Sequence, residues 1–151
     1  MITRRKLLVV LGAATLTAPL SSFAQPQRAK IARIGLLEPS SASSSANLRE
    51  ALIAGLRELG YVEGKNIIIE YRSAEGKYER LPGLAAEMLQ MKVDVIVAAS
   101  PPAVQAAQQA TTTIPIVMLR TPDPVGAGFV ASLARPGRNC YNARPDPLFP
   151  L

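Results

Sequence analysis

Residues 92–128 read KVDVIVAASPPAVQAAQQATTTIPIVMLRTPDPVGAG, and this stretch decides the fold. The apolar run at 93–98 is rich in β-branched residues, which is typical of a strand buried on both faces. Ser100 can cap a helix, and Pro101 suits the first helical position, where a backbone N–H would be unpaired anyway. A second apolar run follows at 116–119. The stretch therefore predicts strand, helix and parallel strand with a right-handed crossover.

The strand and helix patterns continue outward along the chain. Residues 30–37 form a strand pattern, and Gly35 within it would let a neighbouring backbone or a ligand come close. The second half of a strand pattern at 66–72 alternates apolar and polar residues, which indicates an edge strand with one solvated face. Leucines at helical spacing predict a buried stripe in a helix that starts at Asn47, where Glu50 would complete a capping box.

Two further helix patterns complete the series. One covers residues 80–91, with Pro82 in its first turn, and the other is expected to begin in the small and apolar segment 126–133. The resulting order is β-α-β-α-β-α-β-α. Strict alternation predicts the α/β class, with an open, mostly parallel sheet and helices on both faces.

Polar residues follow three of the predicted strands at their carboxyl ends, where open α/β sheets bind their ligands. Hydroxyl groups of the serine-rich loop at 38–45 could hydrogen-bond a small polar ligand, or the loop could be a plain flexible connection. Backbone N–H groups at the start of the central helix could hold a carboxylate, helped by the helix dipole. The candidate ligand-binding residues are Ser40, Ser41, Ser100, Ala103, Val104, Thr121 and Asp123.

Two of these candidates have an equally plain structural explanation. The Ser100 hydroxyl either contacts the ligand or only caps the helix that follows it. Asp123 either pairs with a ligand ammonium group or stabilises its own proline-rich turn. The residues alone leave both alternatives open.

Composition excludes several classes of function. The chain has 151 residues with no His and a single Cys, which excludes histidine triads, histidine-ligated metals and cysteine-cluster zinc. We therefore expect no metal site and no cofactor. The net charge of +6 comes mostly from residues 4–6 and from the segment after 133, while the remainder is close to neutral. No clustered basic face is indicated, so we expect no nucleic-acid partner.

Residues 1–24 have the pattern of an export signal. A basic start at 3–6 precedes an apolar stretch at 7–20 and a small-residue cleavage site at 22–24. The apolar stretch is shorter than the ~20 residues of a membrane-spanning helix, although an uncleaved anchor is the alternative. The basic start fits either ordinary secretion or a twin-arginine signal. No Cys follows the apolar stretch, so a lipid anchor is not expected.

Several motifs together resemble the ABC-transporter substrate-binding proteins, in the branch related to the tryptophan- and tyrosine-binding lipoproteins. Each motif is weak alone, but the set is specific and spans residues 31–137. The motifs are 56–66 (LRELGYVEGKN), 69–72 (IEYR), 74–78 (AEGKY), 92–97 (KVDVIV), 114–117 (IPIV), 123–126 (DPVG) and 133–137 (LARPG).

The resemblance implies a type I periplasmic-binding fold, in which two α/β lobes enclose a cleft. It implies a monomeric protein that is not an enzyme and that binds a small solute, often an amino acid. Its implied partners are a permease in the inner membrane and an ATPase. Residues 25–137 would form the N-terminal lobe, and the missing lipid anchor would make the protein a soluble periplasmic form.

The chain departs from the family pattern after residue 137. The family continues there into a strand and a second lobe, whereas residues 138–151 have neither periodicity nor an apolar run. We expect an irregular, divergent tail in which Cys140 has no role. The hypothesis that follows is a loss of reading frame near Gly137, which would leave a single, functionally impaired lobe.

Two alternative functions remain to be weighed. Residues 126–131 match the spacing of a dinucleotide-binding fingerprint, which would indicate a nucleotide-binding α/β enzyme. The fingerprint should directly follow the first strand, however, and here it follows the fourth. The second alternative is a fragment of a disrupted gene without independent function, because half a clamshell cannot close around a ligand.

Overall fold

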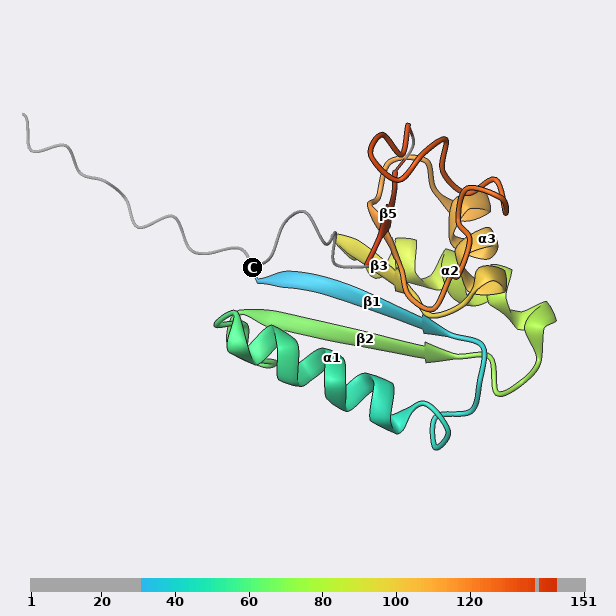
Figure 1. Cartoon of the computed structure of the whole chain (residues 1–151). Helices are drawn as coiled ribbons and strands as arrows, with labels where there is room; N and C mark the ends of the chain where they lie inside the picture. Colours follow the sequence, from blue (N-terminus) through green and yellow to red (C-terminus); the bar gives the residue numbers. More distant parts are fainter. Residues whose placement is uncertain (1–30, 138, 144–151) are drawn as a thin grey trace, which may run out of the picture.

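Five parallel strands form one sheet in the order β2-β1-β3-β4-β5 (Figure 1). The structure is a computed structural model, and it describes residues 31–137 and 139–143. The elements are β1 (Ala32–Glu38), α1 (Ala46–Glu58), β2 (Ile67–Ser73), the 3₁₀ turn η1 (Tyr78–Arg80), α2 (Leu81–Gln90), β3 (Val95–Ala98), α3 (Pro101–Ala110), β4 (Ile116–Met118) and β5 (Cys140–Asn142). The predicted α/β class with an open parallel sheet is confirmed.

The strand order places a topological switch point between β1 and β3. The chain adds β2 on one side of β1, then crosses over to add β3, β4 and β5 on the other side. Sheets of this order bind ligands at the carboxyl ends of the two strands that flank the switch point. The order also puts β2 at an edge, as its alternating sequence predicts.

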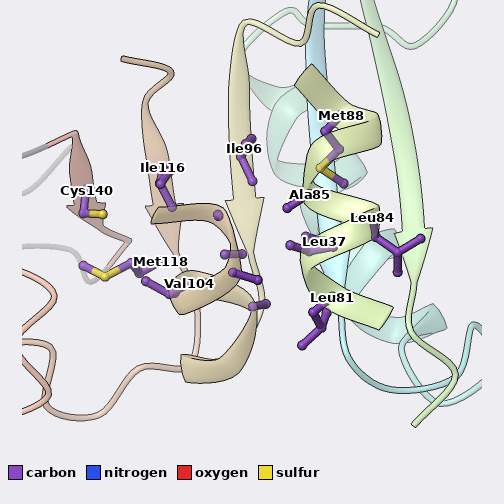
Figure 2. Close-up of a cluster of buried hydrophobic side chains, with 14 of the residues drawn as sticks. Leu37, Leu81, Leu84, Ala85, Met88, Ile96, Val104, Ile116, Met118 and Cys140 are labelled. Atoms are coloured by element: carbon purple, nitrogen blue, oxygen red, sulfur yellow. The ribbon is translucent and has the colours of Figure 1, made fainter. Parts of the chain in front are cut away.

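Helices cover the two faces of the sheet unequally. α2 and α3 lie together on one face, and α1 lies alone on the other (Figure 1). The larger core lies on the α2 and α3 side, where Leu37, Ile96 and Met118 of the strands pack against Met88 and Val104 of the helices (Figure 2). No residue of α1 is fully buried. The predicted leucine stripe of α1 therefore packs on the sheet only in part.

Gly35 serves close packing between the sheet and α2. A Cβ atom at this position would lie 2.8 Å from the Sδ atom of Met88, inside van der Waals contact. The close neighbour is thus a methionine side chain, whereas the sequence pattern predicts a backbone or a ligand there.

The start of α1 differs from the sequence prediction. α1 begins at Ala46 with Ser45 in the capping position, so the predicted cap at Asn47 is wrong. The Ser45 hydroxyl instead bonds to the Ser41 carbonyl oxygen at 2.9 Å and to the Tyr71 hydroxyl at 2.7 Å. A local sequence rule cannot anticipate the bond to Tyr71, because Tyr71 is 26 residues away in the sequence.

The helix predicted at 126–133 is also wrong, because this segment forms turns. Asp123 Oδ1 accepts a hydrogen bond from the Gly126 N–H at 2.8 Å, and Gly128 has a positive φ of 72°. A left-handed residue interrupts the helical backbone, so the segment cannot continue as a helix. The dinucleotide fingerprint lacks its helix for the same reason.

The sequence predicts an irregular chain after residue 137, but a short part of it forms a strand. Cys140–Asn142 forms β5, which pairs in parallel with β4. The Ile116 N–H donates to the Asn139 carbonyl oxygen at 2.7 Å, and the Ala143 N–H donates to the Met118 carbonyl oxygen at 3.1 Å. Cys140 is fully buried in the core, so it has a packing role that the sequence prediction denied it. A three-residue strand is too short to show periodicity.

Within residues 31–137 and 139–143, no helix combines the length and the apolar character that crossing a membrane requires. The export signal predicted at residues 1–24 lies outside the described residues, as does the end of the chain from residue 144.

Candidate functional site

A cavity of ≈420 Å³ lies at the carboxyl ends of the strands. This volume falls in the range of small-molecule sites, about 300–1,000 Å³. Most of the lining is apolar, and three side chains in it are polar. The lining residues are Leu48, Met118, Leu119, Arg120, Thr121, Pro122, Asn142 and Ala143. An apolar cavity with a few polar groups suits a ligand with an apolar body and a polar end.

Arg120 extends from the end of β4 across the ends of both switch-point strands. Its Nε donates to the Ala99 carbonyl oxygen, just after β3, at 3.2 Å. Its Nη2 donates to Oε1 of Glu38, the last residue of β1, at 2.9 Å. The Arg120 side chain is 56% exposed. The guanidinium therefore lies at the point where sheets of this order bind ligands.

The backbone of Arg120 has an uncommon conformation. Its φ is +50°, in the left-handed region that non-glycine residues seldom adopt. The turn follows directly on β4, where the Leu119 N–H still donates to the Ala98 carbonyl oxygen at 2.9 Å. Backbone conformations of this kind cluster at ligand-binding sites. The turn directs the chain away from the sheet while the side chain returns across its edge.

Glu38 is a buried carboxylate at the carboxyl end of β1. Its side chain has no exposed surface. Oε1 accepts hydrogen bonds from Arg120 and, at 3.1 Å, from the Ser40 hydroxyl. Oε2 is buried and has no hydrogen-bond partner among the described residues. Burying a carboxylate is costly unless it is paired, so the pairing with Arg120 is what makes this position tolerable.

The structure places the two predicted serines of the first loop differently. Ser40 donates to Glu38, and its own carbonyl oxygen accepts a bond from the Ser73 hydroxyl at 2.5 Å. Ser41 bonds to the Ser44 hydroxyl at 2.9 Å within the same loop. Ser40 therefore belongs to the cluster around Arg120. Ser41 is held in its own turn and is not among the residues that line the cavity.

The start of α3 offers less to a ligand than the sequence predicts. The Ala103 N–H donates to the Ser100 hydroxyl at 3.5 Å, and the Val104 N–H donates to the Ser100 carbonyl oxygen at 2.9 Å. Ala103 and Val104 are fully buried. In this structure their amides serve the helix cap, and they are not presented to the cavity. Ser100 is the helix cap, although a hydroxyl that accepts one bond can still donate another.

Thr121 and Asp123 differ in whether they line the cavity. Thr121 lines the cavity, and its hydroxyl donates to the Leu119 carbonyl oxygen at 3.4 Å. Asp123 accepts the Gly126 N–H and so stabilises its own turn. Of the predicted site residues, the structure thus brings Thr121, Ser40 and Ser100 near the Arg120 side chain.

Sequence reasoning missed Arg120 and Glu38 as a pair. Each residue interrupts or ends an apolar run, which is a signal that could have been noticed. The two are 82 residues apart, however, and only the sheet brings them together. Leu48 and Asn142 were missed for the same reason, since both reach the cavity from other elements.

A second cavity of ≈420 Å³ lies within the loop that follows Thr121. It is lined by Val125, Gly128, Phe129, Val130, Ala131, Pro136 and Gly137, none of which has a polar side chain. Its described lining offers no side-chain group that could orient a polar ligand, so the cavity at Arg120 is the better candidate site.

A family model described as ABC transporter substrate binding protein matches residues 33–141. The chain is 40% identical over 91 residues to a tyrosine-binding protein of Clostridioides difficile, a match that covers 60% of this chain and 26% of the relative. The chain therefore spans about a quarter of the length of this curated relative.

Solved structures resemble the same region. A conserved domain protein from Vibrio cholerae is 34% identical with a TM-score of 0.70, over 75% of this chain and 38% of that protein. An ABC domain from Streptococcus pneumoniae, solved in complex with L-Trp, is 29% identical with a TM-score of 0.68, over 74% of this chain and 37% of that protein. Both neighbours extend well beyond the part that this chain matches.

Proposed function

This chain belongs to the ABC transporter substrate-binding protein family, and we propose on that premise that it binds a small solute at the carboxyl edge of its sheet. The observation that carries the proposal is the cavity at the carboxyl ends of β4 and β5, which is mostly apolar. Arg120 lines this cavity and also reaches the ends of β1 and β3. Binding proteins orient a solute and do not transform it, so the site needs only shape and a few polar groups.

The proposed solute is an amino acid with an apolar or aromatic side chain. Support comes from the names of the relatives, one a tyrosine-binding protein and one crystallised with L-Trp. The apolar cavity lining fits such a side chain, and the polar side chains fit its charged backbone groups. Thr121 lines the cavity directly, while Ser40 and Ser100 contribute hydroxyl groups at the strand ends. We expect Ser41 and Asp123 to contribute less to solute binding, because each is hydrogen-bonded within its own turn.

We place this binding step in transport across a bacterial inner membrane. A cleaved signal at residues 1–24 would deliver the protein to the periplasm, where it would act as a monomer and hand its solute to a permease driven by an ATPase. In the family's two-lobed fold the edge that carries Arg120 would face the cleft, and a second lobe would supply further contacts. Because the described residues supply the contacts of this edge alone, we expect the 151-residue chain to bind the solute weakly.

A ligand screen by saturation-transfer NMR tests this proposal, because the method detects weak binding. The screen would compare the L-amino acids with nicotinamide nucleotides on the 151-residue chain. We expect saturation transfer to aromatic and large apolar amino acids. Transfer to the nucleotides with none to any amino acid would contradict the proposal.

A matched pair of variants locates the binding. Ala143 is exposed and lines the cavity, whereas Ala127 is exposed and does not. Ala143→Trp fills the cavity and should abolish the saturation transfer, while Ala127→Trp should leave it unchanged. Equal effects of the two substitutions would place the solute elsewhere.

A further inference from the structure

We infer that the Arg120 guanidinium is the anchor for an anionic group of the solute, and that Glu38 is the positioning residue that holds this anchor in place. The inference rests on the proposed function and deepens it, because it names the residue that binds the carboxylate of the solute. An uncharged or purely cationic solute is excluded.

The hydrogen bonds of Arg120 leave part of the guanidinium available. A guanidinium carries five N–H donors. Among the described residues, one donor is used by the Ala99 carbonyl oxygen and one by Glu38 Oε1. The side chain is also 56% exposed, so the remaining donors can reach a ligand. Because the donors are arranged as a rigid fork, one edge can bind Glu38 while another binds a second carboxylate.

The position of the pair favours a ligand role over a role in stability alone. Arg120 lines the cavity, whereas Glu38 lies behind it with no exposed surface. Among the described residues, Arg120 is the single charged residue that lines the cavity, and no acidic side chain of these residues lines it. A ligand that enters the cavity would therefore meet a cation first. Hydrogen bonds between a guanidinium and a carboxylate are among the strongest available to a binding site.

Two contacts fix the anchor before any ligand arrives. The bonds to Ala99 and Glu38 tie the side chain to the ends of β3 and β1, and the φ of +50° holds its backbone in a turn. A long, flexible side chain normally loses rotamer freedom when it binds a ligand. Here the fold has already restricted that freedom, which is what a preorganised binding group requires.

The alternative is that Arg120 only neutralises the buried Glu38. The two roles differ in what they predict for ligand charge. An anchor distinguishes a carboxylate ligand from its amide, whereas a purely structural ion pair does not. The test therefore compares L-tryptophan with L-tryptophanamide, which has the same indole and ammonium groups but no carboxylate.

Two variants isolate the guanidinium from the stability of the pair. Glu38→Gln removes the buried charge and keeps Arg120, and the double variant Glu38→Gln/Arg120→Gln then removes the guanidinium in the same background. Neither variant leaves a buried charge without its partner, so both should fold. Dissociation constants would be measured by NMR titration of the 151-residue chain and of both variants, with thermal unfolding as a check of the fold.

We expect the unmodified chain to bind the acid at least about tenfold more tightly than the amide, since a lost charged hydrogen bond costs about one power of ten or more. Glu38→Gln should keep a smaller preference, because a neutral amide oxygen holds the guanidinium less firmly. The double variant should bind the acid and the amide equally.

Other outcomes distinguish a failure of this inference from a failure of the proposed function. An acid preference that survives in the double variant would overturn the anchor role and leave the proposed function standing, as would equal binding of acid and amide by the unmodified chain. A Glu38→Gln preference equal to that of the unmodified chain would overturn the positioning role of Glu38. Binding of neither compound to the unmodified chain would overturn the proposed function, and the inference with it. The comparison on the unmodified chain needs no variant, so it holds even if the double variant fails to fold.

Discussion

Glu38 and Arg120 form an ion pair in which one partner is fully buried and the other is half exposed. Arg120→Gln alone would leave the Glu38 carboxylate buried without its cation. We predict a loss of about 1–3 kcal/mol in the free energy of unfolding, below the 3–5 kcal/mol of fully buried pairs because water reaches the guanidinium. Urea denaturation of Arg120→Gln, Glu38→Gln and the double variant measures the coupling between the two residues. Strictly additive losses would contradict the pairing.

Gly35 and Gly55 form a matched test of packing at single residues. A Cβ atom at Gly35 would lie 2.8 Å from Met88 Sδ, whereas nothing lies within 4 Å of a Cβ atom at Gly55 in α1. We predict that Gly35→Ala destabilises by about 1–3 kcal/mol through overpacking. Gly55→Ala should stabilise by about 0.5–1 kcal/mol, because alanine suits a helix interior better than glycine. Thermal unfolding measures both, and a stabilising Gly35→Ala would show that the approach of α2 is looser than described.

For single residues, sequence reasoning predicts a contact when the two residues lie near each other in the chain. The Ser100 cap follows from a serine before two prolines, and the structure confirms it. The partners of Glu38 and Gly35 lie on other elements, so no local pattern identifies them. The serine-rich loop lies at the same edge of the sheet as the charged pair, but it does not identify the pair.

The short strand β5 belongs to the scale of elements. Its first residue, Cys140, is fully buried, and its second, Tyr141, is 51% exposed, so the two side chains point to different environments. We predict that Cys140→Asp destabilises by about 3 kcal/mol or more, because it places an unpaired charge in the core. Tyr141→Asp should change stability by less than about 1 kcal/mol. Chemical denaturation compares the two, and equal effects would contradict the position of β5 in the sheet.

Periodicity predicts the elements that are long enough to display it. The first three predicted helices and the four predicted strands are present, although their ends shift by a few residues. The failures have physical causes. Gly128 takes a left-handed conformation and prevents a helix at 126–133, and β5 is held by backbone bonds to β4 that no three-residue sequence reveals.

The arrangement of the whole molecule follows from the strand order. The order β2-β1-β3-β4-β5 brings the ends of β1, β3 and β4 to one edge, and Arg120 connects them there. Sequence alternation predicts the parallel sheet, and with it the edge at which a ligand is expected. It does not predict which side chains meet, because that depends on the order of strands across the sheet. On the basis of the family relation, we propose that this edge binds the solute.

The most direct test of solute binding at this edge is a map of backbone amide chemical shifts during titration with L-tryptophan. We predict that the shifts concentrate at the strand ends, around residues 38–41, 99–100 and 119–121. Amides at the opposite edge, such as those of Lys65 and Lys92, should stay unchanged. Shifts at the opposite edge, or no shifts at any concentration of L-tryptophan, would contradict the proposed site.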